Sequence, residues 1–158
     1  MSQSSEHGEG EEKDSPDISL PLDAHISEEY VPNLNTRLSL YHRPAEVEHI
    51  EEVEEAAREF KDRFGPLSEP LENLLYIVKI KVLATRARVG SISTQGRQIV
   101  IKPTTADSPL KLRGARGVMS EYLDSAVKIG ATQIKLEARL LGDRWTEVLE
   151  EMVSSTSV

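Results

Sequence analysis

The chain has 158 residues, with 19 basic and 27 acidic side chains and a formal net charge of −8. This length suits one compact domain and excludes a motor or a two-domain nucleotide enzyme. The absence of cysteine excludes disulfides, iron–sulfur clusters and thiol nucleophiles. No apolar run approaches the roughly 20 residues of a membrane span, and the acidic N-terminus is unlike a targeting signal. We expect a soluble, cytoplasmic, monomeric domain with no membrane partner.

The charge is unevenly distributed along the chain. Residues 1–30 hold nine acidic residues and one lysine, and residues 46–59 hold seven acidic residues and one arginine. Residues 79–116 show the opposite bias, with nine basic residues and one aspartate. Such an asymmetry bears on partners and electrostatic steering rather than on the fold.

Composition separates a domain from its two ends. Residues 1–16 contain one apolar residue, Met1, and so little apolar surface does not offset the entropy of ordering the segment. We therefore expect a disordered acidic tail or linker at 1–16. The predicted single domain covers 17–153, and a second disordered tail follows at 154–158.

The domain opens with a predicted strand and a short helix. Alternating apolar residues over 18–22 predict a short strand. Pro21 has no N–H to donate, which places this strand at the edge of a sheet. Asn33 and Asn35 are candidate N-caps of a short helix that runs through Tyr41.

Two longer helices follow. Apolar residues recur at spacings of three and four over 46–64, and Gly65-Pro66 ends that helix. Ser68 is the candidate N-cap of the next helix, which Gly90 ends. The interior of this second helix is apolar over most of its circumference, which is typical of a centrally buried helix.

The remaining elements complete the predicted fold class. Gln95-Gly96 is the predicted two-residue turn of a hairpin. Periodicity predicts a helix over 118–127, a half-buried strand over 132–140 and an amphipathic helix over 145–153. Helices combined with few strands indicate an α+β fold. We expect a small antiparallel or mixed sheet packed against several helices, one of them long, central and buried.

The sequence lacks catalytic and cofactor motifs. It contains no GxxxxGK[ST], GxGxxG, HExxH or GxSxG pattern. Its four histidines form no i, i+4 pair, and no cysteine completes a metal site. Acid–base catalysis needs carboxylates in unlike, partly buried environments, whereas many of those here fall on one exposed stripe. We expect no enzymatic activity, no cofactor and no metal in this chain.

The helix at 46–64 carries five acidic residues on one narrow face, within about 40° on either side of the first of them at about 100° per residue. They are Glu48, Glu52, Glu55, Glu59 and Asp62. Neighbours at i+4 repel one another, and the helix dipole, which favours acids in the first turn, does not explain Glu59 and Asp62. The face is either a solvated surface kept for solubility or a docking surface for an arginine-rich partner.

The basic residues of 79–116 suggest a second interpretation, contact with nucleic acid. They are Lys79, Lys81, Arg86, Arg88, Arg97, Lys102, Lys111, Arg113 and Arg116. They are spread over a helix, a hairpin and a loop. Aromatic residues make up only 4% of the chain, so few rings are available to stack on bases. We expect an auxiliary contact rather than the main function.

Two blocks of the sequence resemble the C-terminal domain of the bacterial transcription-repair coupling factor. The first reads YVPNLNTRLSLYHR over 30–43, and the second reads EFKDRFG over 59–65. The two blocks keep the spacing of that family, and the similarity runs from about Ile18 to Lys102. Beyond Pro103 the predicted elements correspond in order only.

The resemblance implies a non-catalytic, autoinhibitory domain of a longer protein. In that family the full protein is an ATP-dependent DNA translocase that removes stalled RNA polymerase and recruits the excision-repair machinery. Its C-terminal domain folds back onto the UvrB-homology module, hides the surface that recruits UvrA and restrains the motor. The family's contact carboxylates fall on Glu59 and Asp62. The implied partner is the UvrB-homology module, with UvrA and RNA polymerase affected indirectly and DNA contacted by the parent motor.

Two alternatives stay open beside this reading. One is an accessory nucleic-acid-binding domain that uses the basic residues of 79–116, and the other is a docking module for a separate protein, UvrA or RNA polymerase. The first block also contains side chains for which we favour a structural role. We expect Leu38 and Tyr41 to pack the short helix and Arg37 to pair locally.

Overall fold

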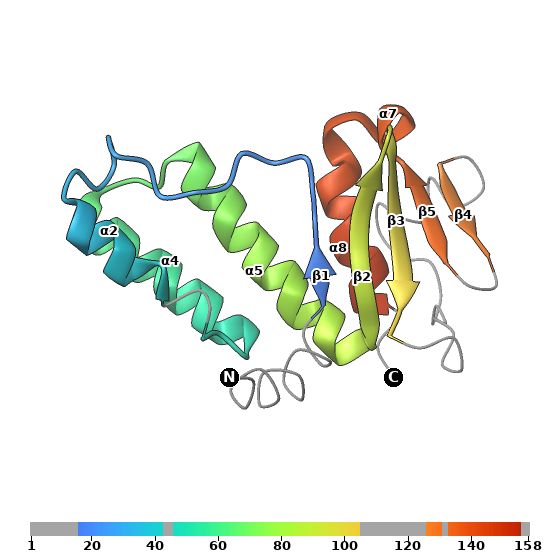
Figure 1. The fold of residues 1–158 in the computed structure, drawn as a ribbon, viewed down its shortest axis with the longest axis horizontal. Helices are drawn as coiled ribbons and strands as arrows, with labels where there is room; N and C mark the ends of the chain where they lie inside the picture. Colours follow the sequence, from blue (N-terminus) through green and yellow to red (C-terminus); the bar gives the residue numbers. More distant parts are fainter. Residues whose placement is uncertain (1–15, 43–45, 105–125, 131–132, 156–158) are drawn as a thin grey trace, which may run out of the picture. The chain divides into compact units, whose positions relative to one another are not determined.

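Figure 1 shows a computed structural model of the chain, which describes residues 16–42, 46–104, 126–130 and 133–155. Within these ranges, no helix combines the length and the apolar character that a membrane crossing requires. The predicted tail at 1–16 lies outside the described residues except for Pro16, which is buried. Of the second predicted tail, Ser154 and Ser155 belong to the last helix, and 156–158 lie outside the described residues.

The chain divides into two compact units. We call Pro21–Val82 the helical unit, and Leu83–Val158 together with Met1–Leu20 the sheet unit. Helix α5 (Glu69–Ala87) contributes most of its length to the helical unit and its last residues to the sheet unit. The single-domain boundaries at 17 and 153 stay a prediction.

The sheet unit contains a five-stranded mixed sheet in the order β1-β2-β3-β5-β4 (Figure 1). Its strands are β1 (Asp17–Ile18), β2 (Val89–Gln95), β3 (Gln98–Pro103), β4 (Val127–Ile129) and β5 (Ile134–Glu137). Among these strands, β1 and β2 are parallel and the other neighbours are antiparallel. The α+β fold is confirmed. Strand β1 lies at an edge of the sheet as expected, but it covers Asp17–Ile18 rather than 18–22, so Pro21 lies beyond the strand.

One face of this sheet is apolar because alternate residues of neighbouring strands are apolar. The register places Ile101 opposite both Ile92 and Ile134, and Ile99 opposite Leu136, and all five side chains are buried. Helix α8 (Trp145–Ser155) adds fully buried residues at the predicted helical spacing. They are Val148, Leu149, Met152 and Val153.

Two predicted glycine roles differ in the structure. The hairpin turn is Gly96-Arg97, one residue later than predicted, because Gln95 pairs with Gln98 and Gly96 adopts a φ of 65°. Gly90 does not end α5 but lies within β2, where the pairing with β3 is irregular. The prediction that Gly90 is a helix cap is therefore wrong.

Two elements before the last helix differ from the prediction. The strand predicted over 132–140 is β5, and Ala138 already begins helix α7 (Ala138–Leu141), which a 3-10 turn at Gly142–Arg144 follows. Most of the helix predicted over 118–127 lies outside the described residues. Its last residue, Val127, belongs to β4, so the helix prediction is wrong at that position.

The helical unit consists of α2 (Leu34–Leu40), α4 (Ile50–Phe64), most of α5 and the loop that precedes α2. Asn33 caps α2 as predicted, because its Oδ1 accepts a hydrogen bond from Thr36 N at 2.9 Å. The helices and the loop share one apolar core. Its buried members are Ile26, Val31, Leu40, Val53, Ala56, Phe60, Leu71, Leu75 and Val78.

Helix α4 begins later than predicted, whereas α5 begins directly after Ser68 as predicted but lacks the expected side-chain cap. Helix α4 starts at Ile50 rather than at residue 46, and it ends as predicted at Gly65, whose φ is 94°. Ser68 O accepts a hydrogen bond from Glu72 N at 2.9 Å, as a residue at a helix start does. The Ser68 Oγ, however, has no hydrogen-bond partner among the described residues, so the predicted side-chain cap is wrong.

Candidate docking surface

Helix α4 presents four of the five predicted acidic residues on one side, which we call the acidic face. They are Glu52, Glu55, Glu59 and Asp62. Glu55 and Asp62 are exposed, whereas Glu52 and Glu59 are half-buried. At about 100° per residue, the half-buried pair lies nearer to the buried Ala56 than the exposed pair does. The acidic face thus has an inner pair and an outer pair.

The fifth residue, Glu48, precedes the helix, so the expectation that it shares this helical face is wrong. Glu52 explains where α4 begins, because its Oε1 accepts hydrogen bonds from Glu48 N at 2.8 Å and from His49 N at 2.9 Å. The Glu52 side chain therefore satisfies two backbone N–H groups ahead of the first turn. These two hydrogen bonds lower the pKa of Glu52 below its ordinary value.

Replacing Glu52 by alanine should lower the unfolding temperature at neutral pH, because the two N–H groups lose their acceptor. The folded-state pKa of Glu52 lies below its ordinary value of 4.5. This stabilisation is therefore complete above the ordinary value and is lost as the pH falls through the folded-state pKa.

Thermal unfolding of the wild type and Glu52→Ala from neutral pH down to about pH 2 measures the effect, and the unfolding temperatures of the two proteins should converge in acid. Glu51→Ala is the matched control. Glu51 is an exposed acid of the same first turn, and its carboxylate stabilises the helix through its interaction with the helix dipole. A gap between the wild type and Glu52→Ala that stays constant down to about pH 2 would contradict the assignment to the ionised carboxylate.

The outer pair is available to a partner. The side chains of Glu55 and Asp62 take part in no hydrogen bond or ion pair with another described residue. Glu59, by contrast, already takes part in an interaction within the chain. Basic residues border the acidic face, with Arg58 about 40° beyond Asp62 and Arg63 about 40° beyond Glu59.

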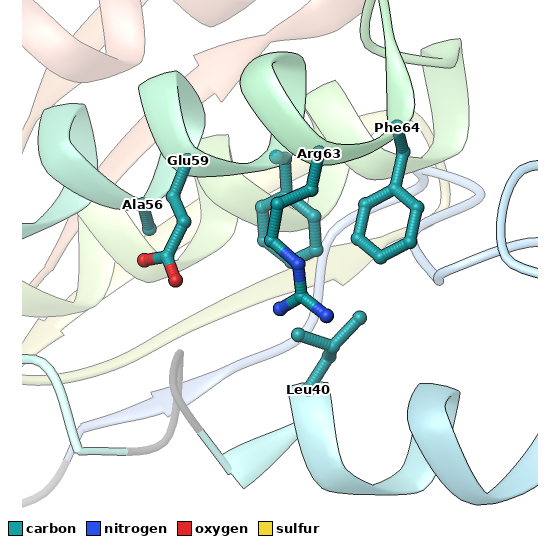
Figure 2. A pocket seen from close by; sticks show the side chains of 6 residues that line it. Leu40, Ala56, Glu59, Arg63 and Phe64 are labelled. Carbon is teal, nitrogen blue, oxygen red and sulfur yellow. The ribbon is translucent and has the colours of Figure 1, made fainter.

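A small pocket lies between α4 and α2, and we call it the α2–α4 pocket. Its lining residues are Leu40, Ala56, Glu59, Phe60, Arg63 and Phe64. In Figure 2 the Glu59 and Arg63 side chains both leave α4 on the side where Leu40 of α2 lies. The Arg63 Cζ atom is 4.9 Å from the centroid of the Phe64 ring, a cation–π distance. The remaining volume of about 10 Å³ is enough for about one water molecule.

Tyr30 joins the two sequence blocks that carry the family resemblance. Its hydroxyl lies 3.1 Å from Phe60 O and 2.8 Å from Gly65 O, and its one proton is shared between these carbonyls at the end of α4. Its ring packs against Phe64 with centroids 5.8 Å apart. Burial raises the pKa of Tyr30, so the hydroxyl stays a donor at neutral pH. The end of the helix that carries Asp62 is therefore fixed to the loop before α2.

Arg37 pairs locally as expected, whereas Tyr41, which is 37% exposed, contacts the loop before α2 through a hydrogen bond rather than packing the short helix. Arg37 Nη1 donates to Val31 O at 2.8 Å and to Pro32 O at 3.1 Å, and the Tyr41 hydroxyl accepts from Ile26 N at 2.7 Å. Leu38 is 55% exposed, so the expectation that it packs the helix is wrong.

The described basic residues of 79–104 are divided between the two units. Lys79 and Lys81 belong to α5 in the helical unit. In the sheet unit, Arg97 lies in the hairpin turn, whereas Lys102 lies five residues away near the other end of β3, roughly 17 Å at the rise of a strand. Arg88 hydrogen-bonds through its carbonyl to Thr104 at that same far end. Residues 111, 113 and 116 lie outside the described residues.

The fold and the surface together define an α+β domain that holds one acidic helix face in a fixed position. The family model of the TRCF domain matches residues 20–112, more than half of the chain. The chain belongs to this family, and the resemblance of the two blocks is confirmed.

Several curated relatives are transcription-repair-coupling factors. The one from Staphylococcus haemolyticus is 28% identical over 146 residues, the one from Rickettsia bellii 37% over 93, and the one from Escherichia coli 30% over 86. These matches cover 90%, 59% and 54% of this chain, respectively. They cover 12%, 8% and 8% of the relatives, so the chain spans a small part of their length.

A solved structure has the same fold. The crystal structure of the C-terminal domain of a transcription-repair coupling factor matches with a TM-score of 0.66 and 15% sequence identity. The match covers 89% of this chain and 89% of that one.

Proposed function

We propose that this chain is a non-catalytic regulatory domain of a transcription-repair coupling factor, a DNA-repair protein whose motor is an ATP-dependent translocase. It docks through the acidic face onto the UvrB-homology module of the same protein in the cytoplasm. Docking masks the surface that recruits UvrA and restrains the motor. The observation that carries this proposal is the exposed carboxylate of Asp62, which no other described residue engages, on a helix end that Tyr30 fixes.

Arginine is the residue type that such a face recognises. A guanidinium binds a carboxylate through charge-assisted hydrogen bonds, each of which contributes about 1.5–3 kcal/mol when desolvated. Contacts of this size at Glu59 and Asp62 would hold a closed state that a competing partner can still open. The fixed helix end supports the proposal further, because a rigid surface loses little conformational entropy on docking.

Charge reversal in the full-length coupling factor tests the proposal. Asp62→Lys alone removes a carboxylate with no described internal contact, and the double variant Glu59→Lys/Asp62→Lys removes both implied contacts. We expect UvrA binding or ATPase activity without ligands to rise by roughly tenfold or more in the double variant. Glu54→Lys, at an exposed position of α4 outside the acidic face, is the matched control and should leave both measurements unchanged.

Circular dichroism of each variant separates loss of docking from loss of folding. If the double variant stays folded and neither UvrA binding nor ATPase activity changes, the docking role of the acidic face is wrong. Titration of this chain with the isolated UvrB-homology module at low and high salt measures the contact directly. Retention of UvrA or RNA polymerase by this chain, without binding to the module, would point instead to docking onto a separate protein.

A further inference from the structure

The sheet has a polar face opposite its apolar one, and we call it the lysine face. Residues that lie directly opposite each other on neighbouring strands share a face, so the register gives its members. Its basic and hydroxyl side chains are Ser91 and Ser93 of β2, Lys102 of β3, Lys135 of β5 and Lys128 of β4. Figure 1 shows β3, β5 and β4 side by side, so the three lysines come from adjacent strands.

The three lysines are neighbours on this face. Lys128 and Lys135 lie directly opposite each other, which places their Cβ atoms about 5 Å apart. Lys102 is the diagonal neighbour of Lys135, at about 7–8 Å, because Lys135 lies opposite Val100, two residues before Lys102. Like charges directly opposite each other destabilise a sheet. The stability of the fold therefore does not account for this arrangement.

Two acidic residues share the lysine face, but neither forms an ion pair with a lysine. Glu137 accepts a hydrogen bond from Gln98 Nε2. Asp17 lies on β1, two strands from Lys102, which is about 10 Å at the spacing of neighbouring strands. The side chains of the three lysines take part in no hydrogen bond or ion pair with another described residue. Two of them are exposed, and the third, Lys135, is half-buried.

The chemistry of this face favours phosphate over carboxylate. Ser91 and Ser93 are half-buried, and their hydroxyls hydrogen-bond to no other described residue, so they add donors to the three ammonium groups. Phosphate oxygens accept such hydrogen bonds, and lysine binds phosphate as a point charge. Carboxylates are recognised best by the planar fork of arginine, and none of the described residues of this face is an arginine.

The same residues favour a duplex over a single strand. Among the residues that the structure describes, this face contains no aromatic ring on which an unpaired base could stack. The lysines extend over two strand spacings, about 10 Å, which is wider than one phosphate group. Duplex DNA carries one negative charge per about 1.7 Å of its axis, so it presents several phosphates to a surface of this width.

From this arrangement we infer that the lysine face binds the phosphate backbone of duplex DNA without reading its sequence. The contact goes beyond the proposed function, because it uses the sheet unit and not the acidic face of α4. Of the described basic residues of 79–104, Lys102 belongs to this face. Lys128 and Lys135 lie outside the basic stretch that the sequence indicated.

Titration of a fluorescently labelled duplex of about 20 base pairs with this chain, followed by anisotropy at several salt concentrations, tests the inference. Three phosphate contacts predict a slope of about −3 for the logarithm of the binding constant against that of the salt concentration. Lys128→Gln/Lys135→Gln should bring the slope to about −1 and weaken binding about tenfold or more at low salt. Lys102→Gln alone should reduce the slope by about 1.

Arg58→Gln/Lys61→Gln is the matched control, because it removes the same two charges from exposed positions of α4 in the helical unit. It should keep the wild-type slope, so the comparison cancels the change in net charge. Thermal unfolding controls for folding, and Lys128→Gln/Lys135→Gln should be at least as stable as the wild type because two like charges are removed.

Equal binding of the duplex by the two double variants would overturn the inference, and so would the absence of salt-dependent binding by the wild type. Binding of polyglutamate by the wild type without binding of the duplex would also overturn it, and would assign the lysine face to an acidic protein segment. The UvrB-homology module takes no part in these titrations. Failure of the DNA contact therefore leaves the proposed function in place, and failure of the docking leaves the DNA contact in place.

Discussion

Replacement of Gly90 by alanine should destabilise the sheet unit by about 2–4 kcal/mol. A Cβ atom at this position would lie 2.7 Å from Pro103 O and 2.8 Å from Thr104 Cα. Both atoms belong to the backbone of the segment that ends β3, so neither moves away as a flexible side chain would. The pairing of β2 with β3 is already irregular between Val89 and Ser91, where Gly90 lies. The glycine is therefore required for the close approach of two backbones.

Urea unfolding followed by the fluorescence of Trp145 measures this effect, because Trp145 lies in helix α8 of the sheet unit. Gly96→Ala is the matched control. Its Cβ meets no atom within 4 Å, and only its φ of 65° disfavours alanine, so a loss of about 1 kcal/mol is expected. Equal losses for the two variants would contradict a steric role for Gly90 and leave only the general cost of replacing glycine.

The sequence was sufficient for elements whose signal is periodic and local. The apolar stripe of α8, the apolar circumference of α5 and the Asn33 cap of α2 all follow from residues within one helix. The alternation of Ile134 and Leu136 likewise predicted β5. The helix and strand periods are local in the sequence and do not depend on distant contacts. The sequence alone therefore predicts the α+β class.

The errors fall at element boundaries, one of them set by a local cap and the other by a contact distant in the sequence. Helix α4 begins at Ile50 because the Glu52 carboxylate caps it, although acidic residues from position 46 onward also suit a helix N-terminus. Gly90 was assigned to a helix end because glycine favours that position. Arg88 takes the positive φ of 61° just after α5 instead, and the contact with Pro103 explains the glycine.

The sequence predicted which carboxylates share one side of α4, but it did not predict the pocket next to them. Helical spacing brought together Glu55, Glu59 and Asp62 without any knowledge of the fold. The α2–α4 pocket depends on Leu40, which comes from another helix, and no spacing within α4 indicates it. The Tyr30 hydrogen bonds span 30 and 35 residues, so the sequence indicated them only through the constant spacing of the two blocks.

Replacing Phe60 by alanine should cost about 3–5 kcal/mol, the range for truncating a buried phenylalanine. Phe60 is 3% exposed and belongs to the core that joins α4 to α2 and α5. Its ring also packs against Phe64, with centroids 6.3 Å apart. Loss of the ring leaves a cavity in the core next to the α2–α4 pocket, which Phe60 lines. Because domains of this size are stable by only about 5–15 kcal/mol, this one change removes a large share of the total.

Denaturant unfolding followed by far-ultraviolet circular dichroism measures the loss, and Phe60→Leu, which keeps most of the volume, should lose only about 1–2 kcal/mol.

The Phe60 variants also test whether the proposed docking needs α4 to be held firmly in the core or needs only the charges on its surface. Phe60→Ala keeps Glu59 and Asp62 but leaves them on a helix with a weakened attachment. It should therefore bind the UvrB-homology module less tightly than Phe60→Leu even where both chains remain folded. Equal binding by the two variants would show that docking depends on the charges alone and not on how the core holds α4.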